Sequence, residues 1–315
     1  MKPLDTKPKP RVRDVIDFGS NEAAKATPSP KLSAELIAQP DPATTVLHAI
    51  NAEGEVFSLS GTGDSTPLNF PDRHQALEIA VANPDGAVFV LARELPAPST
   101  SGLRDYALWR HETQGWRRVL DIPGCAARPV IAGSAQGVWV STGANLALFD
   151  NDKLGLAEPL DFSPTAISEG YEGTVWLLGG EKRYGGVEVR RYDHPSGRWF
   201  LLPPPAAAIS LAASPDGTAW GVSTKGELWR FSRDGAGTFR ECGNDADCRR
   251  CFYKPDRSFV RSVAMGNDGN VWLLSGRADE TGYEIERMVN LRTRETHQPN
   301  PPLRAVSIAA ASSAR

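Results

Sequence analysis

One short pattern recurs along this chain and limits it to folds built from repeated strand pairs. An apolar stretch leads into a tight turn that ends in glycine, and a second apolar stretch with an aromatic residue follows. The pattern is clearest in 77–91, 209–222 and 259–274, and looser copies lie at 130–140 and 166–178. Most copies have Asp-Gly or Glu-Gly at the turn, and such pairs favour the positive φ angles of a tight hairpin. Each copy therefore predicts two antiparallel strands joined by a hairpin.

The spacing of the turn glycines gives the size of the repeat. The spacings are 51, 36, 44 and 52 residues, with a mean of about 46, between Gly86, Gly137, Gly173, Gly217 and Gly269. A period of this length is typical of a four-stranded propeller blade. The 315 residues less the first 43 leave 272, which is about 45 for each of six blades. We therefore predict an all-β, six-bladed β-propeller over residues 44–315.

Third and fourth strands can be identified after three of these hairpins. Third and fourth strands are predicted at 107–110 and 116–119, at 187–192 and 199–202, and at 227–231 and 239–240. Residues 44–60 align best with third and fourth strands, and residues 305–311 align with a first strand. We expect both ends of the chain to build one shared blade, because closure of the ring removes free sheet edges. No second strand for this blade is evident in the sequence.

Residues 1–43 differ in composition from the repeats. They contain seven prolines and five lysines among many alanine, serine and threonine residues, and such a segment buries too little apolar area to offset its ordering entropy. We predict a disordered tail with two apolar islands, at Val15, Ile16 and Phe18 and at 32–37. The first island is a candidate docking motif for a partner or for the protein's own body. The alternative is a solvated leader with incidental hydrophobic residues.

Charge and hydropathy exclude several classes of protein. The net charge is −3 and the pI is about 6.0, which argues against a nucleic-acid-binding domain. No run approaches the roughly 18 apolar residues of a membrane-spanning helix, so we expect no membrane span. The amino end carries charge and proline where a signal peptide needs an apolar segment. We therefore expect a cytoplasmic protein, and the alternative is export by a route without a cleaved signal peptide.

The motif Ser-x-Asp-Gly-x-x-Trp at 214–220, with echoes at 268–272 and 85–89, resembles the repeat of tectonin-like, virginiamycin B lyase-like and two-component-regulator-type β-propellers. The resemblance extends over residues 44–312 through one short motif per blade. It implies the propeller architecture and leaves the function open, because unrelated activities share such a fold. Similarity to the lyase brings no catalytic residues, since no copy carries a histidine and an acid in that family's pattern. Similarity to tectonins implies glycan binding.

Tryptophan and histidine are the first candidates for binding or catalysis. The eight tryptophans occupy repeat positions, so we expect most of them to pack between blades, while a ring left exposed could stack on a sugar. The histidines fall singly in different repeats, at His48, His74, His111, His194 and His297. Without metal-binding spacings, we expect them on the surface or in turns. The sequence also lacks a phosphate-binding loop and a nucleophile elbow, so we expect no cofactor and assign no metal site.

An insertion before the last full repeat holds three of the four cysteines, namely Cys242, Cys248 and Cys251. A tetrahedral zinc site needs four ligands, and the fourth cysteine, Cys125, occupies the equivalent connection three blades earlier. The sequence leaves three alternatives open: unmodified thiols, a local disulfide, or a metal site. A disulfide would contradict the cytoplasmic expectation.

Topology predicts which face of the propeller binds a partner. Loops between second and third strands share a face with the connections between blades, and three of them are long, at 93–105, 179–186 and 275–283. They alternate with short turns at 142–143 and 225–226. With the cysteine insertion they bring arginine, lysine and tyrosine to one rim, as in contact surfaces; the alternative is solvated loop charge. The candidate binding residues are Lys182, Arg183, Tyr184, Arg249, Arg250, Tyr253, Lys254, Arg277 and Tyr283.

These observations favour a recognition function. We predict a non-catalytic recognition or scaffold propeller that binds a protein partner or a carbohydrate through its long-loop face, with the tail tethering it to a larger assembly. The alternative is a lyase- or hydrolase-type enzyme with its site at the mouth of the central channel, and a third is a purely structural subunit. Exposed aromatic rings would favour glycan binding, whereas a histidine and a carboxylate in one pocket would favour an enzyme. Apolar patches on the outer strands would favour a structural subunit.

Overall fold

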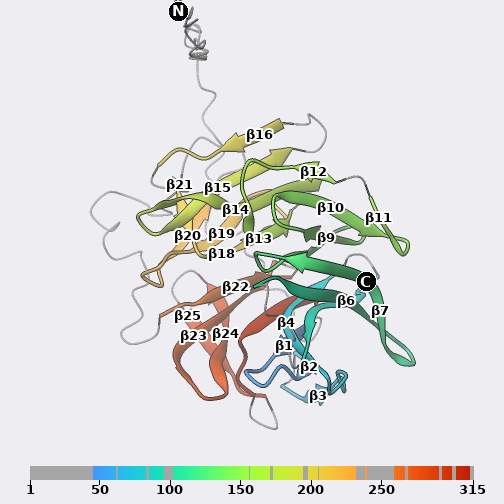
Figure 1. Ribbon diagram of the computed structural model, residues 1–315. Helices are drawn as coiled ribbons and strands as arrows, with labels where there is room; N and C mark the ends of the chain where they lie inside the picture. Colours follow the sequence, from blue (N-terminus) through green and yellow to red (C-terminus); the bar gives the residue numbers. More distant parts are fainter. Residues whose placement is uncertain are drawn as a thin grey trace, which may run out of the picture. The chain divides into compact units, whose positions relative to one another are not determined.

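The structure of the protein is a computed structural model (Figure 1). The residues that it describes are 45–61, 63–82, 85–95, 102–155, 157–170, 173–193, 198–204, 206–231, 238–239, 259–266, 269–290, 293–299 and 303–312. The predicted tail at 1–43, with Val15, Ile16 and Phe18, lies outside them. Within the described part of the chain, no helix is long and apolar enough to cross a membrane.

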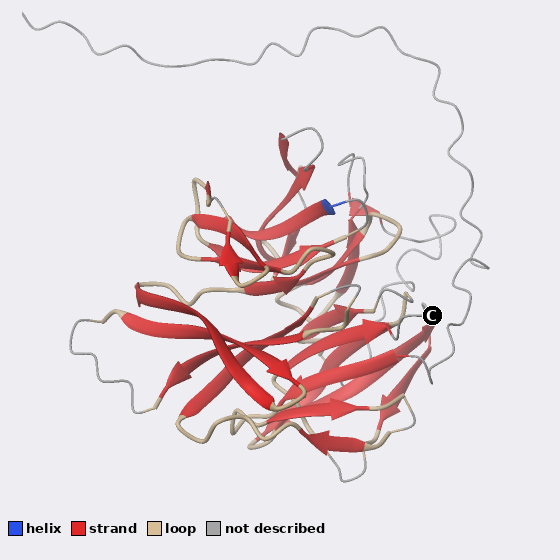
Figure 2. Ribbon diagram, turned by 90° about the vertical axis from the view of Figure 1, so that its right-hand side faces the viewer, coloured by secondary structure: helices blue, strands red, loops and turns tan. Residues whose placement is uncertain are grey.

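The described strands form six antiparallel sheets, which confirms the all-β, six-bladed β-propeller (Figures 1 and 2). From the innermost strand outward, blade 1 contains β26 (Ser307–Ser312), β1 (Thr45–Ile50), β2 (Val56–Leu59) and β3 (Ser65–Pro67). Blade 2 contains β4 (His74–Val81), β5 (Val88–Glu94), β6 (Arg104–Glu112) and β7 (Gly115–Cys125). Blade 3 contains β8 (Ile131–Gly133), β9 (Val138–Ser141), β10 (Asn145–Asp150) and β11 (Lys153–Leu154), and β12 (Glu158–Pro159) also pairs with β10.

The other three blades have the same order. Blade 4 contains β13 (Pro164–Glu169), β14 (Thr174–Arg183), β15 (Gly186–Asp193) and β16 (Arg198–Leu201), and β17 (Ala207–Ala208) also pairs with β15. Blade 5 contains β18 (Ser210–Ala213), β19 (Ala219–Val222), β20 (Leu228–Phe231) and β21 (Thr238–Phe239). Blade 6 contains β22 (Ser262–Met265), β23 (Val271–Asp279), β24 (Gly282–Asn290) and β25 (Thr293–His297).

The six innermost strands close a ring. Each contacts the innermost strands of both neighbouring blades, and the contact of β22 with β26 joins the last blade to the first. Polar links connect neighbouring inner strands: Ser168 Oγ accepts a hydrogen bond from Ala213 N at 2.8 Å. Ser210 Oγ likewise accepts one from Val263 N at 3.1 Å. The hydrophobic core is divided among the blade interfaces, where each pair of neighbours shares a cluster of buried side chains.

Tryptophan supplies much of this interface. All eight tryptophans are described, and each is buried or partly buried. Trp176 and Trp272, on the second strands of blades 4 and 6, belong to the largest fully buried side chains. The prediction that most tryptophans pack between blades is confirmed, and it explains why the aromatic residue recurs just after each turn.

The shared blade differs from the prediction. β26 is its innermost strand, as expected, but β1 pairs with it along its whole length, from Thr45 opposite Ser312 to Ile50 opposite Ser307. β1 is therefore the second strand, β2 the third and β3 the fourth. The assignment of residues 44–60 to third and fourth strands is wrong, and the unassigned second strand is β1 itself. The turn pattern that marks strands one and two elsewhere is missing here because the two ends of the chain supply these strands.

The turn glycines serve two different purposes. Positive φ angles of 70°, 74°, 80° and 84° are found at Gly86, Gly173, Gly217 and Gly269, as the hairpin pattern predicts. Gly137 does not share this conformation, and a Cβ atom there would lie 2.2 Å from Phe149 O. At that position glycine permits the close approach of two backbones, which no other residue allows.

Two of the predicted long loops are strands. In the segment 179–186, β14 and β15 continue until Arg183 pairs with Gly186. In the segment 275–283, β23 and β24 continue until Asp279 pairs with Gly282. Both hairpins contain a register shift, which marks a β-bulge. The glycines in these segments suggest loops in the sequence, but in the structure a bulge accommodates them within the strands.

Candidate functional site

The hairpin face is the end of the propeller that carries the turns between second and third strands and the connections between blades. In blades 4 and 6 the second and third strands extend into long hairpins on this face, β14–β15 and β23–β24. Blades 1, 3 and 5 instead have short turns at 51–55, 142–145 and 223–227. In blade 2 a longer segment separates β5 from β6. Residues 96–101 of this segment lie outside the described residues. Long and short elements therefore alternate around this face.

The two extended hairpins use the same residues at the same spacing. The shared residues are Gly180, Gly186 and Glu188 in blade 4 and Gly276, Gly282 and Glu284 in blade 6. In each hairpin the second glycine lies against the chain that enters the next blade. A Cβ atom on Gly186 would lie 2.2 Å from Ala208 O, and one on Gly282 would lie 2.8 Å from Ala305 O. The next blade therefore contacts each hairpin at the last strand pair before its tip.

A buried ion-pair network strengthens the hairpin of blade 4. The side chain of Glu188 is 5% exposed, and it accepts hydrogen bonds from Arg183 at 2.7 Å and from Arg190 at 3.1 Å. Arg183 also donates to Leu202 O at 3.1 Å, and Arg190 donates to Asp161 at 2.6 Å. Burial raises the pKa of Glu188, but the hydrogen bonds from Arg190 and Arg183 outweigh it and leave the pKa below its ordinary value. The carboxylate stays ionised and binds both arginines to the hairpin.

The tip of this hairpin presents an aromatic ring. Tyr184 is 78% exposed. Lys225, on the short turn of blade 5, donates a hydrogen bond to Tyr184 Oη, and its Nζ lies 4.5 Å from the centre of the ring. This hydrogen bond raises the pKa of Lys225. Phe259, which leads into blade 6, packs against the adjacent Gly226 and is 67% exposed. Tyr184, Lys225 and Phe259 are called the aromatic patch below.

Exposed apolar side chains concentrate on the hairpin face. Eight large hydrophobic side chains are exposed among the described residues. Five of them lie in turns or blade connections of the hairpin face, namely Leu95, Leu103, Tyr184, Phe259 and Val306. The other three are Leu154, Phe200 and Leu201, on the outer strands of blades 3 and 4. The hairpin face is thus the more apolar of the two faces, which favours contact with another molecule.

The other candidate binding residues have different environments. Lys182 is exposed on the same hairpin as Tyr184. Tyr283 is partly buried against the core between blades 6 and 1, and its backbone pairs with Ala305. Arg277 belongs to β23, but its side chain is outside the described part of the chain. Four candidates and three cysteines lie wholly outside the described residues, namely Arg249, Arg250, Tyr253, Lys254, Cys242, Cys248 and Cys251.

Cys125 is the cysteine whose environment is described. It ends β7 and is a free thiol. Burial, together with the charge of Asp105, raises its pKa, so the thiol stays protonated and is a weak nucleophile. Within the described residues, no group of three histidine, cysteine or acidic side chains is arranged to hold a metal ion.

The expectation that the histidines lie on the surface or in turns is wrong for His48, and His194 lies outside the described residues. His48, on β1, is 7% exposed, and its Nδ1 has no hydrogen-bond partner among the described residues. Burial, and to a lesser degree the nearby His111, lowers its pKa to about 4. His111 packs edge-on against Trp116 with ring centres 4.9 Å apart. No local sequence pattern signals the burial of His48, and its electrostatic neighbour His111 lies in the next blade, more than sixty residues later in the chain.

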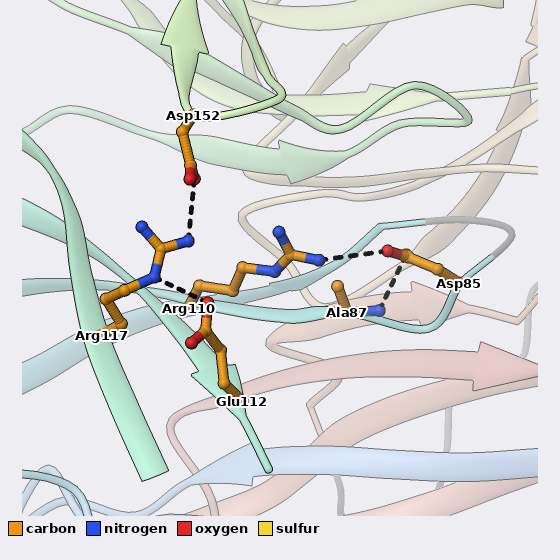
Figure 3. A network of polar contacts seen from close by, with 6 residues as sticks. All are labelled: Asp85, Ala87, Arg110, Glu112, Arg117 and Asp152. Atoms are coloured by element: carbon orange, nitrogen blue, oxygen red, sulfur yellow. Dashed lines mark hydrogen bonds and ion pairs between the residues drawn. The ribbon is translucent and has the colours of Figure 1, made fainter. Parts of the chain in front are cut away.

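The opposite face carries ion pairs between neighbouring strands and blades (Figure 3). Arg110 lies 3.4 Å from Asp85, both in blade 2. Arg117 lies 2.7 Å from Glu112 in its own blade and 2.9 Å from Asp152 in blade 3. These charged groups are engaged with each other, so they connect elements of the propeller and do not form an unpaired binding surface.

Comparisons with known proteins bear on the fold. No protein-family profile matches the sequence, and no curated protein matches it. TolB from Acinetobacter baumannii aligns with a TM-score of 0.55 and 11% identity, over 86% of this chain and 66% of TolB, so the chain spans just under two thirds of that chain. A chain in a crystal structure of a nidogen/laminin complex aligns with a TM-score of 0.41 and 8% identity, over 86% of this chain and 100% of that chain. The likeness to TolB shows the fold alone, which is a β-propeller.

Proposed function

We propose that the protein is a non-catalytic recognition propeller that binds a protein partner through the hairpin face. The observation that carries this proposal is the aromatic patch, in which Tyr184 and Phe259 are 78% and 67% exposed. Tyrosine and phenylalanine are enriched in protein interfaces, and a few such residues provide most of the binding free energy. Two aromatic side chains that are exposed on the same face as other surface hydrophobic residues are suited to binding a protein partner.

The hairpin beneath the patch supports the proposal. Glu188 binds Arg183 and Arg190 on this hairpin, and Lys225 contacts the ring of Tyr184 at its tip. A ring that is already held in place loses little conformational entropy on binding, so more of the contact energy appears as affinity. The patch is therefore better prepared for binding than an isolated side chain on a loop.

A protein partner fits this surface better than a carbohydrate. The resemblance to tectonin-like propellers implies sugar ligands, which would stack on aromatic rings exposed at the repeat positions. Here every tryptophan of the repeat is buried or partly buried. The aromatic positions that recur from blade to blade are therefore used in the core, and the exposed rings of Tyr184 and Phe259 lie outside those recurring positions.

The N-terminal segment completes the proposal. Residues 1–43, with Val15, Ile16 and Phe18, would act as a tether that joins the propeller to a larger assembly. The support is the composition of this segment, which cannot form a core of its own but contains an apolar island. Partner binding by the propeller and tethering by the tail can be separated by deleting residues 1–43.

The experiment is affinity capture from native lysate, followed by a measurement with the purified partner. The baits are the full-length protein, a Tyr184→Ser, Phe259→Ser double variant, and a Phe200→Ser control on an outer strand. Phe200 is also exposed, at 38%, so the control removes a comparable ring away from the hairpin face. Each captured protein is then produced separately, and its Kd is determined for all three baits.

We expect a partner that the wild type and the control bind equally well and the double variant binds at least roughly thirty-fold more weakly, since interface aromatic residues contribute about 2 kcal/mol or more. Partners whose Kd values are the same for all three baits would contradict the proposal. A fourth bait lacks residues 1–43. A partner that the double variant still binds and this fourth bait does not bind would assign recognition to the tail instead.

A further inference from the structure

Three exposed cations lie at the aromatic patch. Lys225 belongs to the patch itself, with its Nζ 4.5 Å from the centre of the Tyr184 ring. Lys182 is exposed two residues before Tyr184, and Arg261 is exposed two residues after Phe259. The side chains of Lys182 and Arg261 form no ion pair within the described part of the chain. Two of the three positive charges are therefore without an opposite charge there.

The strand register places Lys182 on the same side of its hairpin as Lys225. Lys182 pairs with Val187, and directly opposite residues of antiparallel strands point to the same side of the sheet. Val187 packs against the core cluster that blades 4 and 5 share. Lys182 therefore extends from the side of the hairpin that faces blade 5, where Lys225 meets Tyr184.

Backbone pairing places Arg261 beside Phe259. Phe259 O accepts a hydrogen bond from Gly276 N at 3.1 Å. Arg261 N donates to Leu274 O at 2.7 Å, so this segment runs along β23 in an extended form. Val260, between them, is 2% exposed and belongs to the core cluster of blades 5 and 6. Because side chains alternate along an extended segment, Phe259 and Arg261 share the side that points away from this core.

Exposed acidic groups do not balance these cations. Among the exposed residues of the hairpin tip, the blade 5 turn and the entry to blade 6, Glu181 is the one acid that the structure describes. Glu227 is partly buried on the blade 5 turn, where its carboxylate accepts a hydrogen bond from Ser223 Oγ at 3.3 Å. Exposed cations therefore outnumber exposed acids three to one around the two rings.

A partner that covers Tyr184 and Phe259 also removes water from these cations. An apolar partner surface would leave Lys182 and Arg261 dehydrated and unpaired, which costs free energy. Carboxylates opposite them replace the lost hydration, and complementary charge also speeds association. The surface therefore disfavours neutral and basic partners and favours acidic ones.

We infer that the partner segment that binds the hairpin face is acidic, with carboxylates on both sides of an apolar or aromatic side chain. That side chain contacts the rings of Tyr184 and Phe259. The carboxylates pair with Lys182, Lys225 and Arg261. The inference rests on the proposed function and names the chemistry of its partner. A short peptide is a sufficient probe, because the rings and cations belong to neighbouring elements of blades 4, 5 and 6.

The test is calorimetric titration of the full-length protein with four acetylated hexapeptide amides. The acidic probe is Glu-Glu-Leu-Phe-Glu-Glu. Two peptides change the charge, Gln-Gln-Leu-Phe-Gln-Gln and Lys-Lys-Leu-Phe-Lys-Lys, and Glu-Glu-Ala-Ala-Glu-Glu removes the large apolar side chains. We expect the acidic probe to bind roughly tenfold more tightly than the glutamine peptide, because three exposed ion pairs of ordinary strength together contribute about that factor. The lysine and alanine peptides should bind more weakly than the acidic probe.

Two results of these titrations would overturn the inference. One is an equal Kd for the glutamate and glutamine peptides at about 50 mM salt, where charge screening is weak. The other is a thymidine hexanucleotide that binds as tightly as the acidic probe, because the surface would then recognise polyanions in general and not an acidic peptide.

Neutralising two of the cations tests their positions. Lys182→Gln, Arg261→Gln removes both charges and keeps the side chains long, and Lys225 is left unchanged because its loss would also free the ring of Tyr184. We expect this double variant to bind the acidic probe roughly fivefold more weakly and the glutamine peptide as the wild type does. Arg73→Gln removes another exposed cation of the hairpin face, between blades 1 and 2, and is the control. An equal loss in the control variant would overturn the inference, because net charge would then set the affinity.

Reversing the charges should reverse the preference. The double variant Lys182→Glu, Arg261→Glu should bind the lysine peptide more tightly than the acidic probe. Both positions are exposed, so folding is expected and is checked by an unchanged Tm. A folded variant that still prefers the acidic probe would contradict the inference.

The two proposals can fail separately. A captured partner that needs Tyr184 and Phe259, but whose Kd changes neither with salt nor in the glutamine double variant, would overturn the acidic segment and leave the recognition face in place. Acidic-probe binding that needs Lys182 and Arg261, with no captured partner dependent on the two rings, would support the acidic ligand and contradict the proposed function.

Discussion

Asp216, in the tight turn between β18 and β19, pairs with Arg230 on β20. The guanidinium group of Arg230 in turn lies 5.6 Å from the centre of the Trp220 ring. Asp216 also accepts a hydrogen bond from Thr218 N at 3.0 Å. One carboxylate therefore closes the turn and ties it to the third strand, while the arginine covers the aromatic residue of the second strand.

The same arrangement recurs in blade 2 (Figure 3). Asp85 accepts a hydrogen bond from Ala87 N at 3.0 Å and lies 3.4 Å from Arg110. Arg110 lies 5.7 Å from the centre of the Phe89 ring. The Asp-Gly-x-x-aromatic motif is thus a structural device for holding three strands, which explains why it predicts architecture and carries no information on a ligand.

We expect Asp216→Ala to lower the free energy of unfolding by roughly 1–2 kcal/mol, because it removes the ion pair and the turn hydrogen bond together. Asp85→Ala is the matched control and should cost less, since Asp85 is 58% exposed and its pair with Arg110 is longer. Urea unfolding of both variants measures the difference. An equal loss in the two, or no loss in Asp216→Ala, would show that the pair does not stabilise the blade.

The sequence is sufficient to predict the first two strands of five blades because their signal is local. Gly217 and Trp220 are three residues apart, and both the turn and the buried ring can be identified from that spacing alone. The order of strands in blade 1 could not be predicted in this way, since β26 and β1 come from opposite ends of the chain. The role of Asp216 was missed although a signal exists: an arginine recurs on the third strand, as in Arg110 and Arg230.

His48 gives the protein a dependence on pH. Its pKa is lowered from 6.5 to about 4 by burial, so between these values the unfolded state binds more protons than the folded state. The contribution of His48 to stability is complete above pH 6.5 and is lost as the pH falls towards 4, by roughly 3 kcal/mol at most. Urea unfolding at pH 7 and pH 4.5 should show a smaller difference for His48→Gln than for the wild type.

The control for this prediction is the remaining pH dependence of the variant. Burial also lowers the pKa values of His74 and His297, so His48→Gln should reduce the loss of stability in acid without removing it. Parallel curves for the variant and the wild type would show that His48 is not the group responsible.

Glu188 should be more important for the hairpin face than its counterpart in blade 6. Glu188→Gln leaves Arg183 and Arg190 without a buried carboxylate and should cost roughly 2 kcal/mol. Glu284→Gln is the matched control: Glu284 is 42% exposed and pairs with Arg304 at 3.1 Å, so its loss should cost under about 1 kcal/mol. Urea unfolding and hydrogen exchange in β14 and β15 measure the effect. Equal costs would mean that the network does not hold Tyr184 in place.

The candidate site was harder to predict than the fold because its residues come from different blades. Lys225 and Tyr184 meet across blades 4 and 5, and Phe259 reaches back from the entry to blade 6. Topology predicts Tyr184 on this face of the propeller, in a long loop, but predicts neither its place at a hairpin tip nor the engagement of Arg183 with Glu188.

Removal of residues 303–315 should open the ring. It deletes β26, which pairs with β1 from Ser312 opposite Thr45 to Ser307 opposite Ile50 and also contacts the inner strands β4 and β22. Two sheet edges would then be exposed, so we expect aggregation or a fall in Tm of roughly 10 °C or more. Removal of only the three residues after Ser312 is the control and should leave Tm unchanged, as measured by differential scanning calorimetry. A chain shortened at residue 302 that still unfolds cooperatively at the wild-type temperature would show that β26 does not close the propeller.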